Sequence, residues 1–174
     1  MASRLRFLQR LLLIDEMAKP FPPSSVCTSM SFELRDHTAD VAVEATGPTL
    51  SAAFAAAADG LAAAMCDEIP DSGERFDLEV RAESREALLF DYLDELIYQR
   101  DVRGVLPVDN EVEIRAGASD DGDRARGSEW VATGSARGVP LVGLGAREVK
   151  AVTYSEMALE ETDDGWRAYV VFDV

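Results

Sequence analysis

Alternating apolar and polar residues mark the first two predicted strands, and helical spacing follows them. Residues 32–36 and 41–45 alternate in the manner of two β-strands that meet near a short turn. Thr49 is a suitable N-cap, because the apolar residues from Leu50 to Met65 recur on one stripe of a helix. The pattern therefore predicts a strand pair followed by an amphipathic helix whose apolar stripe faces the core.

A second strand and helix follow in the same style. Residues 76–80 alternate apolar and acidic side chains, which predicts a half-buried strand. Ser84 is the expected N-cap of a helix whose apolar face lies within residues 88–97. Glu86 in the first turn and Arg100 near the end both suit the helix dipole.

The C-terminal half is predicted to consist of strands. The expected segments are a short strand at 112–114, a polar loop at 117–128, a strand at 130–136, a loop or short strand at 139–144, and strands at 148–159 and 166–173. Residues 163–165, Asp-Asp-Gly, are a strong hairpin signal between the last two strands. Both faces of the last strand are apolar, which predicts a central, covered position in the sheet.

This order of elements predicts the α+β class. We expect a single domain in which two helices pack on one face of a mostly antiparallel (mixed) β-sheet. Residues 1–29 differ from the rest, since they are basic and are broken by prolines. We interpret 1–29 as an N-terminal extension that is disordered or not native, and 30–174 as the folded domain.

The charge of the chain limits the classes of function that it can have. The net charge is −16, and residues 30–174 alone hold 13 basic and 31 acidic residues. Such a surplus with almost no lysine is typical of adaptation to a salt-rich cytoplasm, although a dedicated acidic binding surface is the alternative. A chain this acidic does not bind a phosphate backbone by itself, so any RNA would be bound by a partner.

The cysteines and the hydropathy of the chain also indicate the cytoplasm. Cys27 and Cys66 form no metal motif, and nothing else indicates an oxidising compartment. No stretch approaches the ~20 apolar residues that cross a bilayer. We therefore expect a cytoplasmic protein without a membrane partner.

Carboxylates at the two ends of the domain are the main candidates for chemistry. Asp36 and Asp40 lie near its start, and Asp173 is next to the last residue. If the fold brings them together, their oxygens would bind a hard divalent cation or a basic partner. Lys150 is the single lysine of the body, and it is either a retained functional charge or an exposed strand residue. His37 is the single histidine, which excludes sites that need two imidazoles.

The chain resembles the archease family in several motifs, in the family's order. They are DHTAD at 36–40, the helix start at Thr49-Leu50, LLFDYLDELIY at 88–98, EVKAVTY at 148–154 and VFDV at 171–174. The resemblance covers about residues 32–174. It implies an accessory, chaperone-like protein that is not itself an enzyme. Its partner would be the RNA ligase that joins 3′-phosphate or cyclic-phosphate ends to 5′-hydroxyl ends in tRNA splicing and RNA repair. The family promotes guanylylation and multiple turnover of that ligase.

The resemblance also implies a cation site. In the family a divalent ion, taken to be calcium, is held at positions that match Asp40, Asp173 and Val174, the last through its carboxylate; magnesium is the other candidate. The positions associated with ligase activation on the same surface are Asp36, His37 and Lys150. One departure is Ser155, where the family commonly has a histidine, and no role is carried onto it.

Other function classes use the same residues differently. A small divalent-metal-dependent hydrolase could employ the same aspartate cluster, but it would also need a general base and a substrate pocket. An acidic binding module unrelated to RNA ligation is a further alternative. Hydrolysis of phosphoesters without the ligase, compared with ligase turnover in its presence, distinguishes the first two classes.

Overall fold

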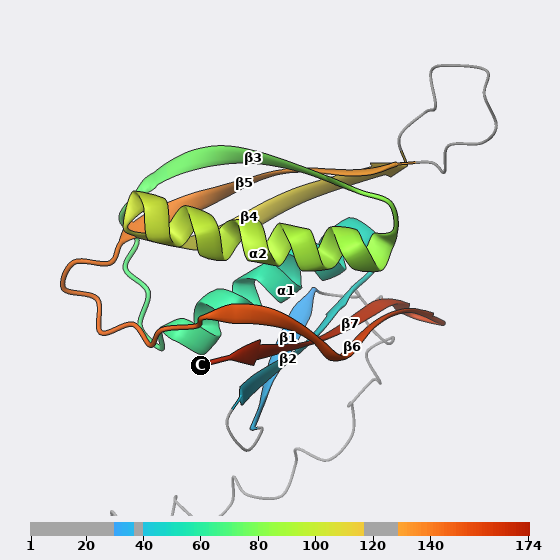
Figure 1. Cartoon of the computed structure of the whole chain (residues 1–174), viewed down its shortest axis with the longest axis horizontal. Coiled ribbons are helices and arrows are strands. Elements are labelled where there is room, and N and C mark those ends of the chain that lie inside the picture. The colour runs from blue at the N-terminus through green and yellow to red at the C-terminus, as the bar shows by residue number, and fades with distance from the viewer. Residues whose placement is uncertain (1–29, 37–39, 117–128) are drawn as a thin grey trace, which may run out of the picture.

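Seven strands and two helices make up the described part of the molecule. The computed structural model describes residues 30–36, 40–116 and 129–174 (Figure 1). In chain order the elements are β1 (Ser31–Asp36), β2 (Asp40–Gly47), α1 (Leu50–Met65), β3 (Glu74–Ala82), α2 (Arg85–Arg103), β4 (Val105–Ala116), β5 (Trp130–Pro140), β6 (Ala151–Thr162) and β7 (Gly165–Asp173). Among these residues, neither helix is long and apolar enough to cross a membrane.

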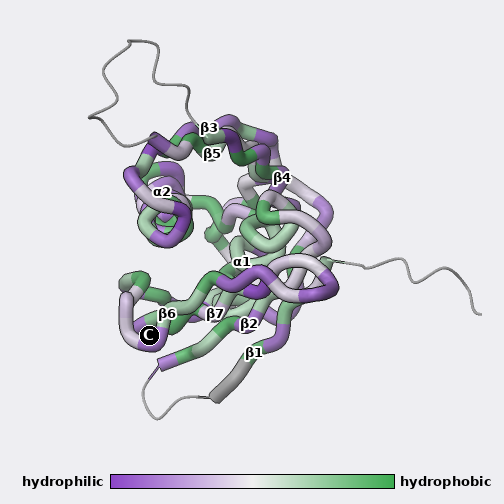
Figure 2. The backbone as a smooth tube through the Cα atoms, turned by 90° about the vertical axis from the view of Figure 1, so that its right-hand side faces the viewer, coloured by the Kyte–Doolittle hydropathy of each residue, from purple (hydrophilic) through white to green (hydrophobic). Residues whose placement is uncertain are grey.

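The strands form two antiparallel sheets with the helices between them. The first sheet has the order β1-β2-β7-β6 and the second β3-β5-β4. Helix α1 packs against β1, β2 and β7 of the first sheet and β4 of the second, while α2 packs against all three strands of the second sheet and β6 of the first. Figure 2 shows the same layering from the side, with both helices between the sheets.

The predicted class, a single α+β domain with two helices and antiparallel strands, is confirmed. The observed arrangement differs from the predicted one in one respect. We expected a single sheet with both helices on one face, whereas the structure has two sheets that enclose the helices. Alternation along a strand identifies which side chains face the core, but it does not identify the neighbouring strand. The number of sheets therefore could not be derived from the pattern.

Both helices begin where the capping residues predict. Thr49 Oγ1 accepts a hydrogen bond from the Ala52 amide, and Ser84 Oγ accepts one from the Ala87 amide, each at 3.1 Å. These bonds satisfy donors that the first turn of a helix leaves without partners. Gly104 ends α2 with a left-handed conformation at φ 65°.

Strand boundaries differ most in β4. The predicted strand at 112–114 is only the second half of β4, whose register shifts between Val108 and Glu111. This bulge breaks the alternation, and Pro107 in the first half also argues against a strand. A proline is tolerated here because β4 lies at the edge of its sheet.

Arg100 lies in the last turn of α2, where its charge suits the helix dipole as predicted, and it has a further role. It is buried, with only 6% of its surface exposed. Nη1 donates to the Val149 carbonyl at 2.7 Å, and Nη2 lies 2.7 Å from Asp101 Oδ1. Arg100 therefore ties the last turn of α2 to the segment that precedes β6.

A single guanidinium connects both sheets at the other end of α2. The Arg85 guanidinium carbon lies 5.4 Å from the Trp130 ring centroid and 5.0 Å from that of Trp166. Trp130 begins β5 in the second sheet, and Trp166 lies in β7 of the first. These cation–π contacts hold the N-terminus of α2 between the two sheets.

We predict that the Tyr92 hydroxyl leaves no room for a side chain at Gly134. A Cβ atom at Gly134 would lie 2.7 Å from Tyr92 Oη, which is buried and has no hydrogen-bond partner among the described residues. Gly134→Ala should lower the free energy of unfolding by about 2 kcal/mol through overpacking. Tyr92→Phe should cost little, because the hydroxyl makes no bond that is lost.

Urea unfolding of both single variants and of the double variant tests this relation. Adding Tyr92→Phe should recover only part of the loss, since it removes the nearest atom but leaves the Glu111 carbonyl oxygen at 3.0 Å and Tyr92 Cε2 at 3.2 Å from the new methyl group. Strictly additive effects would show that the hydroxyl is not what excludes a side chain at Gly134.

Candidate functional site

Two of the predicted aspartates face each other across neighbouring strands. Strands β2 and β7 pair in an antiparallel register that sets Asp40 opposite Asp173. Directly opposed residues share one face of a sheet, with Cβ atoms about 5 Å apart. Strand β7 is central in its sheet, as predicted, and upstream of Asp173 the side chains of Val170 and Phe172 are fully buried. The fold thus places both carboxylates at the end of a fixed strand pair, where Asp173 is exposed.

Lys150 lies at the same strand end. Its amide donates to the Asp173 carbonyl at 2.8 Å, and its ammonium Nζ donates to the Val174 oxygen at 3.0 Å. Strand β6 begins only at Ala151, which lies opposite Asp173, so Lys150 precedes the strand instead of lying within it as predicted. Lys150 therefore lies beside the main chain of Asp173, and its positive charge lies beside the last residue.

The remaining predicted positions are only partly described. The backbone of Asp36 ends β1 opposite Val41, one residue from the pair that contains Asp40. Its side chain lies outside the described residues, and so does the whole of His37. The structure thus brings Asp40, Asp173, Lys150 and Val174 together and gives no side-chain position for the other two.

The donor set is compatible in kind with a hard cation. Asp40, Asp173 and Val174 offer carboxylate and main-chain oxygens, which calcium and magnesium prefer. Among the described residues, no group of three His, Cys, Asp or Glu side chains is placed to hold a metal ion. A cation here would therefore depend on two aspartate side chains together with the Val174 oxygen.

Comparison with known proteins identifies the family. The model of the Archease protein family (MTH1598/TM1083) matches residues 32–174. The chain belongs to the archease family. It is 34% identical to protein archease of Pyrococcus furiosus over 82% of this chain and 98% of that protein. It is also 34% identical to protein archease of Archaeoglobus fulgidus over 83% of this chain and all of that protein.

Solved archease structures share the fold. The solution structure of Methanobacterium thermoautotrophicum protein 1598 has a TM-score of 0.66 at 29% identity, covering 82% of this chain and 98% of that one. The crystal structure of a Thermotoga maritima archease, described as a possible chaperone, has a TM-score of 0.52 at 21% identity and covers 92% and 99%. The second likeness concerns the fold alone.

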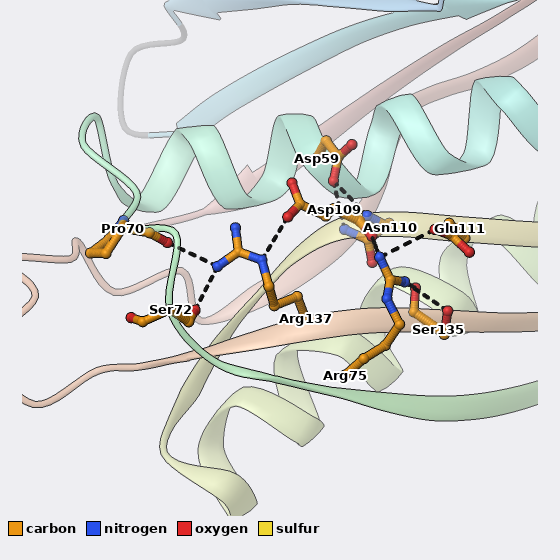
Figure 3. A network of polar contacts seen from close by, with 9 residues as sticks. All are labelled: Asp59, Pro70, Ser72, Arg75, Asp109, Asn110, Glu111, Ser135 and Arg137. Atoms are coloured by element: carbon orange, nitrogen blue, oxygen red, sulfur yellow. Dashed lines mark hydrogen bonds and ion pairs between the residues drawn. The ribbon is translucent and has the colours of Figure 1, made fainter.

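A second polar cluster, which the sequence did not predict, lies away from the archease motifs at the bulge of β4 (Figure 3). The amide and Nδ2 of Asn110 donate to Asp59 Oδ1 on α1 at 3.0 and 2.8 Å. Asp109 adopts a left-handed backbone at φ 51°, and two arginines hold it. Arg137 Nε donates to its carboxylate at 2.6 Å, and Arg75 Nη2 donates to its carbonyl at 2.8 Å. The cluster fixes the bulge against α1, which is a structural role.

We predict that the Asp59 charge costs stability at neutral pH. Burial, first, and then the nearby Asp109 raise the pKa of Asp59, although the bonds from Asn110 oppose the shift. A carboxyl with a raised folded-state pKa contributes stability below its unfolded pKa of about 3.9 and loses that contribution as the pH rises through the folded value. Asp59→Asn keeps an acceptor for Asn110, so it should be at least as stable as the wild type at pH 7.

Thermal melts of Asp59→Asn, Asp59→Leu and wild type between pH 3 and pH 7 test this prediction. Any advantage of the asparagine variant should shrink toward pH 3, where wild-type Asp59 is protonated. The leucine variant lacks the acceptor and should be destabilised throughout. A constant offset between the asparagine variant and the wild type would contradict the raised pKa.

One exposed feature in the archease motifs was not recognised from the sequence. Tyr154 stacks on Phe90 with ring centroids 4.0 Å apart and planes at 2°, yet its side chain is 60% exposed. Both residues belong to quoted motifs, but an aromatic residue in an apolar pattern is usually part of the core. Only the relative positions of α2 and β6 show that the pair lies at the surface.

Proposed function

We propose that this archease is a non-catalytic activator of the RNA ligase that joins 3′-phosphate or cyclic-phosphate ends to 5′-hydroxyl ends. It would promote guanylylation and multiple turnover of the ligase in tRNA splicing and RNA repair, in the cytoplasm. Family membership, which the similarity to proteins named archease also shows, supports an accessory role. The family does not favour the alternative of a metal-dependent hydrolase.

The observation that carries the proposal is the pairing of Asp40 with Asp173 beside Lys150. Asp40 and Asp173 are more than 130 positions apart in the sequence, yet they meet at one strand end beside Lys150. The core does not need charged residues at that end. The half-buried Asp40 and the exposed Asp173 and Lys150 form a surface suited to a charged protein partner. Asp36 and His37 belong to this surface by motif.

A divalent cation, calcium or magnesium, is proposed as the cofactor of this surface. Asp40, Asp173 and the Val174 carboxylate would hold it, and bound there it would neutralise carboxylates that otherwise repel each other. Lys150 donates to the Val174 oxygen and so fixes the last residue in place. These residues would present a rigid, partly neutralised site to the ligase.

RNA would be bound by the ligase alone. The net charge of −16 opposes contact with a phosphate backbone, so this archease would reach RNA only through its partner. Its role is then to change the state of the ligase and not to position the substrate.

Ligase turnover on cyclic-phosphate RNA ends, with and without this protein, tests the proposal. Without this protein, each ligase molecule should complete about one turnover, and with it each should complete many. The guanylylated ligase should also form faster. The pure protein should release no product from phosphoester substrates without the ligase. Hydrolysis by the protein alone that is lost in Asp173→Asn would instead establish the hydrolase.

A further inference from the structure

The outer side of α2 and the adjacent edge of β6 form one exposed surface that the proposed cation site does not use. We call it the α2–β6 face and define it by Asp91, Asp94, Tyr98 and Tyr154. The three α2 residues are exposed and follow each other at spacings of three and four, so they share one side of the helix. Helix α2 packs against β6, and Figure 1 shows the C-terminus below the end of α2 that leads into β4. The face thus runs beside the strand that begins after Lys150.

Tyr154 is a fixed aromatic platform at this face. One face of its ring lies flat on Phe90, and the side chain remains 60% exposed, as Tyr98 does at 57%. The register of β6 with β7 breaks between Thr153 and Ala158, so Tyr154 has no paired residue in β7. An aromatic ring that is fixed on one face and exposed on the other is typical of a protein–protein contact site.

The charges of this face are acidic. Asp91 and Glu83 lie close enough to Tyr154 to raise the pKa of its hydroxyl, after the effect of burial. The arginines of α2 are directed elsewhere: Arg85 lies between two tryptophans, Arg100 is buried, and Arg103 lies over the Phe76 ring. The exposed ring of Tyr154 therefore lies near two carboxylates, those of Asp91 and Glu83.

We propose that the α2–β6 face docks an arginine-bearing surface of the ligase. A guanidinium stacks on the open face of Tyr154, and Asp91 and Asp94 accept its hydrogen bonds. The identity of the partner rests on the proposed function, whereas the chemistry of the contact rests on this face alone. A nucleic acid or a second copy of this chain would bring negative charge against negative charge. Stacking also persists in molar salt, which screens exposed ion pairs.

Calorimetric titration of the ligase of the same organism with variants of this protein tests the proposal. Tyr154→Ala should weaken binding about tenfold, as for residues central to an interface. Tyr154→Phe keeps the platform and should bind nearly as the wild type does. Asp91→Asn/Asp94→Asn should weaken binding and flatten its salt dependence.

Asp77→Asn/Glu113→Gln is the matched control. It makes the same change of charge on the outer face of the second sheet, where both side chains are exposed. Binding should be unchanged, and melting curves show that each variant is folded.

A titration of ligase turnover separates this inference from the proposed function. Variants of the α2–β6 face should raise the concentration needed for half-maximal stimulation, whereas Asp173→Asn should lower the maximum itself. If Tyr154→Ala and the double asparagine variant bind as the wild type does while the wild type stimulates, the docking proposal is wrong and the function stands. If the wild type neither binds nor stimulates the ligase, both proposals are wrong.

Discussion

Asp173→Asn should abolish activation of the ligase and leave a folded, soluble protein. Asp173 is exposed at the end of β7, so its carboxylate contributes little to the core, unlike the buried Phe172 before it. It lies opposite Asp40, and removing one of two like charges relieves repulsion and so should not destabilise the fold. A cation held by few ligands should lose most of its affinity when one becomes an amide.

Three measurements check this expectation: ligase turnover, calorimetric binding of calcium and magnesium, and the melting temperature. Asp164→Asn makes the same exchange in the turn before β7, at the opposite end of that strand, and should leave all three unchanged. Extending the chain beyond Val174 should mimic the defect, because it converts the α-carboxylate into an amide. Full activation by Asp173→Asn, with unchanged cation binding, would show that the site is assigned wrongly.

Thermal stability should rise steeply with salt. The folded region holds 31 acidic against 13 basic residues, and two of the described arginines are each shared between two carboxylates, Arg81 between Glu79 and Glu129 and Arg167 between Glu44 and Glu160. The remaining repulsion acts over a Debye length of about 30 Å at 0.01 M salt but only about 3 Å at 1 M. We expect the midpoint to rise by about 10 °C or more over this range, equivalent to roughly 3 kcal/mol.

Melting curves in potassium chloride, compared with curves in sucrose at equal osmolality, separate screening from general solute effects. Asp77→Lys/Glu113→Lys reduces the negative charge on the outer face of the second sheet, so it should flatten the curve. A midpoint that does not depend on salt would contradict salt adaptation and favour a dedicated acidic surface.

Local signals in the sequence were sufficient for most of the fold. Thr49 and Ser84 cap the two helices, and Asp163 and Asp164 connect β6 to β7, with Gly165 at φ 136°. Each signal depends on a few neighbouring residues, so it can be recognised without the tertiary structure. The division into two sheets and the first half of β4 depend on distant partners, such as the contact of Asn110 with Asp59.

The candidate site was predictable only in part. Asp40 and Asp173 were suggested by their positions in the chain, but their pairing depends on the register of β2 and β7. The position of Lys150 before β6 is fixed by Arg100, which the sequence placed at the helix dipole. Tyr154 was missed because its exposure depends on the relative positions of α2 and β6, which the motifs do not show.

The contact of Arg85 with Trp130 and Trp166 gives the protein a built-in optical reporter. These are the two tryptophans of the chain, and both rings lie on one guanidinium where α2 meets the two sheets. Intrinsic tryptophan emission therefore originates at a single junction and not from the molecule as a whole. A change in its wavelength without a change in helical circular dichroism would record the two sheets moving apart while each helix stays intact.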